Sequence, residues 1–276
     1  MKSKFSKTLS LSLTALTAAI VLFSCKKDKK EKTADNTEAV QLSIAQNTSE
    51  TLYDDVFDVV LQDGQSNNVA GKGESCATVT LNNTEPNTFP KVMTIDFGTG
   101  CISSNNVTRK GKLIATLSGK IRTAGTVISV AFENYYVNGY KLEGSFSITN
   151  NSGNSGLGFT TQTTNGKLIY PDGTTWFTHS GTHTLTQTAG AGTVTFTDDD
   201  FSLTGNGTTA SSAGNSLSTN ITTALIKKAT CTNIVSGVQA FTYNSISGSL
   251  NYGDGSCDNL ATLTVGLYNQ SVTLPR

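Results

Sequence analysis

The clearest fold signal in the chain is residues 127–149, VISVAFENYYVNGYKLEGSFSIT. At its centre, Asn138-Gly139 is the two-residue signal of a type I′ hairpin turn, because both residues tolerate the positive φ angles that this turn requires. Beyond the turn, apolar and polar residues alternate with the period of a half-buried strand. The apolar side carries Tyr140, Leu142, Phe146 and Ile148. The stretch therefore predicts two antiparallel strands over 127–137 and 140–148.

The same alternation extends outward from this hairpin, from Gly71 to the end of the chain. Short runs of Thr, Val, Ile, Ser and aromatic residues are separated by Gly and Asn, and Asn165-Gly166 and Pro171-Asp172-Gly173 repeat the turn signal. The runs have no helical segments between them, which disfavours parallel crossovers. The sequence predicts an all-β antiparallel meander of about a dozen strands, forming a sandwich or a partly open, curled barrel.

One amphipathic helix is expected before the strands, over Glu50 to Asp63. Thr48 or Ser49 would be its N-cap, and Gly64 stands where a helix commonly ends. Its apolar positions recur at helical spacing: Leu52, Val56, Val59 and Val60, with Tyr53 and Phe57 beside them. This face is expected to pack against the strands.

The N-terminus has the features of a secretory signal. Lys2, Lys4 and Lys7 precede an apolar run over 9–23 that is too short for a stable membrane span. The run ends in Leu22-Phe23-Ser24-Cys25, which resembles the lipobox of bacterial lipoproteins. The resemblance implies cleavage before Cys25, lipidation of its thiol and acylation of its amine. Several acyl chains give lasting membrane attachment. An ordinary, non-lipidated signal peptide is the alternative.

These features divide the chain into a signal peptide (1–24), a lipidated Cys25 with a flexible charged tether (25–48), and the helix with one β domain (49–276). Residues 26–36 are charged and lack aromatic residues, which is typical of a solvated spacer. Eight of the 20 basic residues precede residue 33, but only two of the 20 acidic residues do. The body is therefore acidic, which argues against nucleic acid as a partner.

The remaining four cysteines predict disulfides. Cys76 and Cys101 are separated by about the same interval as Cys231 and Cys257, and similar Gly- and Asp-containing phrases precede Cys101 and Cys257. An even count in an oxidising compartment favours disulfides over a zinc site, which would need C-x-x-C spacing. Of three possible connectivities, Cys76–Cys101 and Cys231–Cys257 are preferred, because each would bridge a local strand pair. Each bridge should stabilise the fold by about 3 kcal/mol.

The first residues after Cys25, Lys-Lys-Asp, are similar to the mature N-termini of lipoproteins from Bacteroidota. The chain also resembles a group of uncharacterised Bacteroidota lipoproteins. Three segments carry this resemblance: FPKVMTIDFGTGC (89–101), TRKGKLIATLSG (108–119) and ENYYVNGYKLEGSFSIT (133–149). The resemblance implies an envelope location at the outer membrane, facing the periplasm or the cell surface. It implies no activity and no catalytic residue.

Few residues suggest chemistry. His179 and His183 would share one face of a strand about 13 Å apart, too far for one metal ion. Calcium ligands are conceivable at 198–200 and at Asp254 with Asp258, although neither fits an EF-hand loop. Aromatic rings on predicted hairpins are expected to enter the core, with sugar stacking as the alternative. They are Tyr135, Tyr136, Tyr170, Trp176, Phe177 and Tyr252. No catalytic, cofactor-binding or metal-binding residue is assigned.

The sequence is therefore interpreted as a non-enzymatic envelope lipoprotein that presents a binding or structural surface. Its partners would be the membrane, through the anchor, and a glycan, an envelope polymer or a protein. Two alternatives are a carrier of a lipid or small apolar ligand in a cupped sheet, and a glycan-active enzyme. A filled interior favours the first interpretation, a continuous apolar cavity favours the carrier, and a cleft with two facing carboxylates favours the enzyme.

Overall fold

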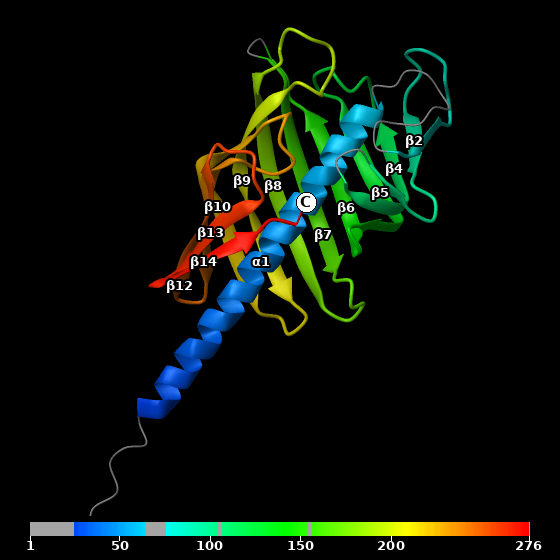
Figure 1. Cartoon of the computed structure of the whole chain (residues 1–276). Helices are drawn as coiled ribbons and strands as arrows, with labels where there is room; N and C mark the ends of the chain where they lie inside the picture. Colours follow the sequence, from blue (N-terminus) through cyan, green and yellow to red (C-terminus); the bar gives the residue numbers. More distant parts are fainter. Residues whose placement is uncertain (1–24, 65–75, 104–105, 154–155, 276) are drawn as a thin grey trace, which may run out of the picture.

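The computed structural model describes residues 25–64, 76–103, 106–153 and 156–275, which form one helix and fourteen strands (Figure 1). The helix is α1 (Cys25–Gly64). The strands are β1 (Thr78–Leu81), β2 (Lys91–Asp96), β3 (Cys101–Ile102), β4 (Thr108–Leu117), β5 (Val127–Val137), β6 (Tyr140–Asn150), β7 (Gly158–Ile169), β8 (Trp176–Ala189), β9 (Asp200–Ser211), β10 (Ser216–Lys227), β11 (Ser236–Tyr243), β12 (Ile246–Asp254), β13 (Leu260–Val265) and β14 (Tyr268–Thr273).

The strands form a single antiparallel sheet in which neighbours along the chain are neighbours in space. The order runs from β1 and β2 through β4 to β14 without a crossover, and β3 adds to β4 beside β2. The predicted all-β antiparallel meander is confirmed. The described strands belong to one open sheet that curls without closing into a barrel, rather than to the two packed sheets of a sandwich.

The hairpin that predicts the fold is present. β5 and β6 meet at Asn138 and Gly139, whose φ angles of 47° and 85° are those a type I′ turn requires. Residues 171–173 also form the expected turn, between β7 and β8.

The predicted turn at Asn165-Gly166 is wrong, because both residues lie inside β7 at a β-bulge. Asn165 has a φ of 48°, and a Cβ at Gly166 would lie 2.6 Å from the Tyr53 hydroxyl oxygen. That hydroxyl donates a hydrogen bond to the carbonyl of Glu143 (2.7 Å). The Asn-Gly pair therefore makes room for a helix side chain instead of reversing the strand.

The concave face of the sheet is occupied by α1, which crosses it from one end to the other (Figure 1). The helix contacts β2 near one edge of the sheet and β13 near the other, as well as β7 to β10 and β12. The predicted apolar stripe is buried there, and Phe57 packs edge-on against Phe159 with ring centroids 5.5 Å apart. At the chain end, the carbonyl of Pro275 accepts a hydrogen bond from Asn138 (3.3 Å). The sheet thus curls around its own helix.

The helix begins earlier than predicted. The flexible tether expected up to residue 48 is wrong from Ala39 onward, because these residues are helical and Ala39, Leu42 and Ala45 are fully buried. Thr48 and Ser49 do not cap a helix start. Their hydroxyls donate to the carbonyls of Ile44 and Ala45 one turn back, at 2.8 Å each.

The predicted signal peptide, residues 1–24, lies outside the described residues. Within the described part of the chain, α1 is not apolar enough along any stretch of sufficient length to cross a membrane.

Candidate functional site

Polar side chains of α1 meet the sheet at the centre of the concave face, around the carboxylate of Glu50. His183 Nε2, on β8, lies 3.1 Å from Glu50 Oε1. Gln239 Nε2, on β11, donates a hydrogen bond to Glu50 Oε2 (2.7 Å), and Gln46 Nε2 donates one to Oε1 (2.6 Å). The carboxylate, with 11% of the side chain exposed, is therefore held by two strands and by its own helix.

Further hydrogen bonds extend this cluster sideways. Gln46 donates to Thr219 on β10 (2.9 Å) and accepts from Thr209 on β9. Thr209 also lies 3.1 Å from Nδ1 of His179. On the next helix position, Asn47 accepts a hydrogen bond from the Tyr252 hydroxyl on β12 (2.9 Å). The network connects α1 to five neighbouring strands, β8 to β12, and thereby fixes the position of the helix.

Burial and pairing shift the ionisation of these groups in different directions. Burial raises the pKa of Glu50, but the nearby His183 outweighs it, so the pKa stays below its usual value. Burial alone would lower the pKa of His183, yet the hydrogen bond and charge of Glu50 raise it. Burial dominates at His179 and lowers its pKa to about 4. At neutral pH, His179 is therefore a neutral ring beside an ionised Glu50.

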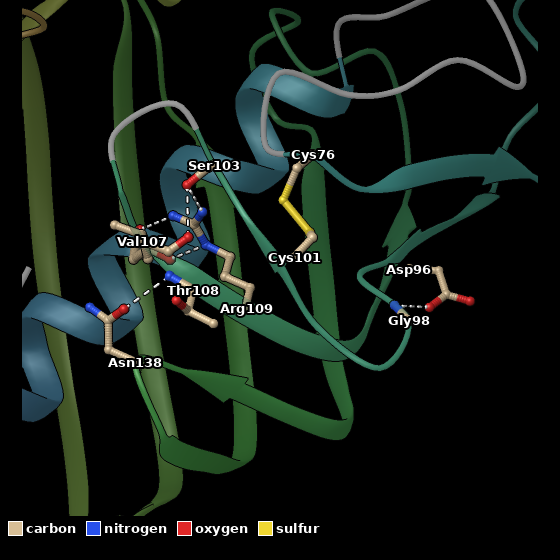
Figure 2. Close-up of a disulfide and its surroundings, with 10 residues drawn as sticks. Cys76, Asp96, Gly98, Cys101, Ser103, Val107, Thr108, Arg109 and Asn138 are labelled. Carbon is tan, nitrogen blue, oxygen red and sulfur yellow. Dashed lines mark hydrogen bonds and ion pairs between the residues drawn. A yellow bond between two sulfur atoms is a disulfide. The ribbon is translucent and has the colours of Figure 1, made fainter.

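A second set of acid–base pairs lies further along the helix. Asp55 accepts hydrogen bonds from Arg109 Nε (2.8 Å) and Nη2 (2.5 Å), and both side chains are almost completely buried. Arg109 Nη1 also donates to Ser103 Oγ (2.8 Å), and Figure 2 shows these two side chains beside the Cys76–Cys101 disulfide. Asp54 and Asp58, which lie one turn of helix apart, bind Lys227 Nζ at 2.7 and 2.5 Å.

Little empty space remains between the helix and the sheet. A cavity of about 50 Å³ adjoins Glu50, His179 and His183. For comparison, an engineered cavity that holds benzene measures about 150 Å³. A larger cleft of about 240 Å³ follows the helix toward its C-terminal end, but ion-pair residues such as Asp55, Arg109 and Lys227 line it. In the part of the chain that the structure describes, these spaces do not form a continuous apolar lumen.

The predicted carboxylate candidates do not assemble into a cation site. Asp198 accepts hydrogen bonds from Thr193 and Thr195, whereas Asp199 binds Gln187. Asp254 and Asp258 each accept from the backbone of their own turns. Among the described residues, there is no group of three His, Cys, Asp or Glu side chains placed to hold a metal ion.

The disulfide prediction agrees with the structure. Cys76 pairs with Cys101 and Cys231 with Cys257, with Cα atoms 6.3 and 5.2 Å apart. The first bridge encloses β1 and β2, and the second encloses β11 and β12. Each bridge therefore closes a loop that contains one antiparallel strand pair.

The aromatic candidates divide between the two faces of the sheet. Tyr135 and Tyr252 are buried on the concave side. Tyr170 and Phe177 are half-buried and pack against each other, with ring centroids 5.6 Å apart. Tyr136 and Trp176 are half-buried on the outer face.

The two histidines share one face of β8, as the strand period predicts. Glu50, the partner of His183, and the amides around it are not identified by the sequence. Residues 46–50, QNTSE, have the composition of a helix start rather than of a buried helix face. Only a three-dimensional arrangement brings them to β8 and β11.

No family model, curated protein or solved structure matches the chain. Its function is therefore inferred from geometry.

Proposed function

We propose that this protein is a non-enzymatic cell-envelope lipoprotein, anchored in the outer membrane through Cys25, that presents the outer face of its sheet as a binding or structural surface. The observation that carries the proposal is that α1 fills the concave face. A curled sheet of this size has two faces on which a partner can bind. Because the helix occupies one of them, the other is the face available to a partner.

The contents of the interior favour this function over the two alternatives. A carrier needs an apolar lumen, but here apolar helix side chains and ion pairs occupy that space. A glycan-active enzyme needs two accessible facing carboxylates. The helix carboxylates Glu50, Asp54, Asp55 and Asp58 instead bind His183, Lys227 and Arg109.

The course of α1 is consistent with an anchored body. The helix begins at Cys25, and among its side chains described from residue 36 onward the first fully buried one is that of Ala39. At the helical rise per residue, these two positions are about 20 Å apart. Figure 1 shows the first turns of α1 projecting beyond the sheet. A lipid on Cys25 would thus hold the β body clear of the bilayer, with its outer face accessible.

Fractionation of a Cys25→Ser variant tests the anchor. Lipidation requires the thiol, so the variant should leave the membrane fraction or retain its signal peptide. A Ser24→Ala variant, which keeps a small residue before the cysteine, should fractionate like the wild type. A Cys25→Ser protein that matures and sediments with membranes as the wild type does would contradict the anchor.

Titration with a hydrophobic dye tests the filled interior. A mature, non-lipidated chain with Cys25→Ser should show no saturable, one-to-one binding of anilinonaphthalene sulfonate. Stoichiometric binding that a fatty acid displaces would favour the carrier instead.

A further inference from the structure

A row of side chains crosses the outer face of the sheet from β4 to β8. Its members are consecutive cross-strand partners: Lys110 pairs with Tyr136, Tyr136 with Lys141, Lys141 with Ile169, and Ile169 with Trp176. We call these five residues the outer-face row. Their chain neighbours Tyr135, Leu142 and Leu168 are fully buried on the concave side. Because successive side chains of a strand point to opposite faces, the row points away from α1.

A lysine ammonium lies over each aromatic ring of the row. Lys110 Nζ is 4.0 Å from the centroid of the Tyr136 ring, and Lys167 Nζ is 4.5 Å from that of Trp176. Lys141, between the two rings, binds Glu143 at 2.7 Å. Both rings are half-buried, and part of each faces solvent. The outer face thus carries two ring–lysine pairs, Tyr136/Lys110 and Trp176/Lys167, with a third lysine between them.

We propose that the outer-face row binds an acidic glycan strand. The inference rests on the proposed function, because it assigns a ligand class to the outer face. On binding, each flexible lysine moves its ammonium from the ring face to a carboxylate or another acidic substituent of the sugar. The apolar face of the sugar then takes the place of the ammonium against the flat ring. β5 and β8 are three strand spacings apart, so the two rings are separated by about 14 Å along the row. A linear glycan laid across the strands meets both pairs and passes over Lys141.

The surroundings of the row favour a glycan over a bilayer. The large exposed apolar residues are Ile44, Ile102, Val127, Val194, Leu260, Leu267 and Tyr268, and none belongs to the row. Beside Trp176, the same face of β8 instead exposes Thr178, Ser180 and Thr182. Hydroxyl groups hydrogen-bond to sugar hydroxyls but give no apolar surface for insertion among acyl chains. A purely acidic peptide would need the lysines but not the rings.

The single tryptophan of the chain makes the proposal directly measurable. Full-length protein in non-ionic detergent is titrated with polygalacturonate and with hyaluronate, and the emission of Trp176 is followed. At least one of these acidic polymers should change the emission saturably, whereas neutral dextran should not. Tyr136→Ala and the double variant Lys110→Gln/Lys167→Gln should each weaken binding about tenfold, the scale of one lost ring or of two lost exposed ion contacts.

Calorimetry extends the test to the tryptophan itself. Trp176→Ala should lose about tenfold in affinity, while Trp176→Phe, which keeps a ring, should lose less than about threefold. Tyr268→Ser, an exposed ring outside the row, is the matched control and should bind like the wild type. Cooperative unfolding of each variant shows that it is folded.

Four results would overturn the proposal: no binding of either acidic polymer, unchanged binding in the row variants, equal binding of polyglutamate, or row-dependent binding of phosphatidylglycerol vesicles. Polyglutamate binding would indicate charge alone, and vesicle binding would indicate a membrane surface. All these measurements use purified protein, so their failure is distinguishable from a failure of the anchor, which fractionation reports.

Discussion

At the scale of single residues, His179 makes stability depend on pH. Unfolded, its imidazole binds a proton near pH 6.5, whereas in the fold it does so only near pH 4. Between these values only the unfolded chain gains the proton, so stability should fall as the pH drops from 6.5 to 4. At about 1.4 kcal/mol per pH unit, the free energy of unfolding should decrease by about 3 kcal/mol over this range. Urea unfolding across this range should show the decline, and His179→Gln should flatten it. An equally steep decline in the variant would contradict this assignment.

His183 should show the opposite pH dependence, because Glu50 raises its pKa. The stabilisation from protonated His183 is fully present below pH 6.5 and is lost as the pH rises through the pKa of His183 in the folded protein. His183→Gln should therefore lower the free energy of unfolding by about 2 kcal/mol near pH 6, which is the scale of a hydrogen bond to a charged group. The cost should be smaller near pH 9. A cost that does not change with pH in urea unfolding would indicate packing rather than the ion pair.

The buried Asp55–Arg109 pair should be sensitive to the loss of either partner. Asp55→Asn leaves the Arg109 guanidinium buried beside a neutral amide, which should lower the free energy of unfolding by about 3 to 5 kcal/mol. Lys112→Gln, at an exposed pair with Asp96, is the control and should cost at most about 1 kcal/mol.

Replacing both partners tests the same pair by removing its two buried charges together. A double variant, Asp55→Leu/Arg109→Leu, should be more stable in denaturant melts than Asp55→Asn, because it leaves no buried charge without its counterion. If the double variant were the less stable one, the unpaired Arg109 guanidinium would not be the cause of the instability of Asp55→Asn.

At the scale of elements, α1 is an integral part of the core. Deleting residues 33–64 would remove buried side chains that each contribute about 1.5 to 3 kcal/mol, including Leu52, Val56 and Phe57. Most domains have a total stability of about 5 to 15 kcal/mol, so the truncated protein should lose cooperative unfolding. A truncated form that melts near the parent midpoint and binds a hydrophobic dye strongly would instead support the carrier.

The sequence predicts some elements well because their signals are local. The period-2 alternation of 140–148 and the Asn138-Gly139 turn locate a hairpin without reference to the rest of the chain. The middle of α1 is different, because Gln46, Asn47 and Glu50 are polar residues that a helix tolerates in its buried face only when a partner is present. Those partners, among them His183, Gln239 and Tyr252, lie on strands far along the chain. No local pattern contains that information.

The same distinction explains the Asn-Gly pairs. Asn138-Gly139 and Asn165-Gly166 have the same local conformational preference, and Asn138 and Asn165 both adopt positive φ. The first reverses the chain, while the second becomes a bulge in β7, where Tyr53 approaches Gly166. The outcome depends on the helix above the strand.

At the scale of the whole molecule, the two disulfides should be native and local. Non-reducing peptide mapping of the purified protein should link Cys76 to Cys101 and Cys231 to Cys257, and no thiol from these four residues should react in denaturant without a reductant. Each bridge should contribute about 3 kcal/mol to stability. Crossed pairs would contradict the arrangement in which each bridge encloses its own strand pair.

The enclosure of α1 also sets an order of events during folding. Each strand pairs with its neighbour in the chain, so hairpins close over short sequence separations and can form early. The helix is synthesised before the strands. Some of its polar contacts can form only after the last strands are synthesised, because Asn47 and Tyr252 are 205 residues apart. Until β12 and β13 arrive, Asn47 lacks its hydrogen-bond partner and one side of the helix is uncovered. The end of the chain therefore completes the burial of its beginning, and a nascent chain stopped before β12 should expose α1 to proteases and chaperones.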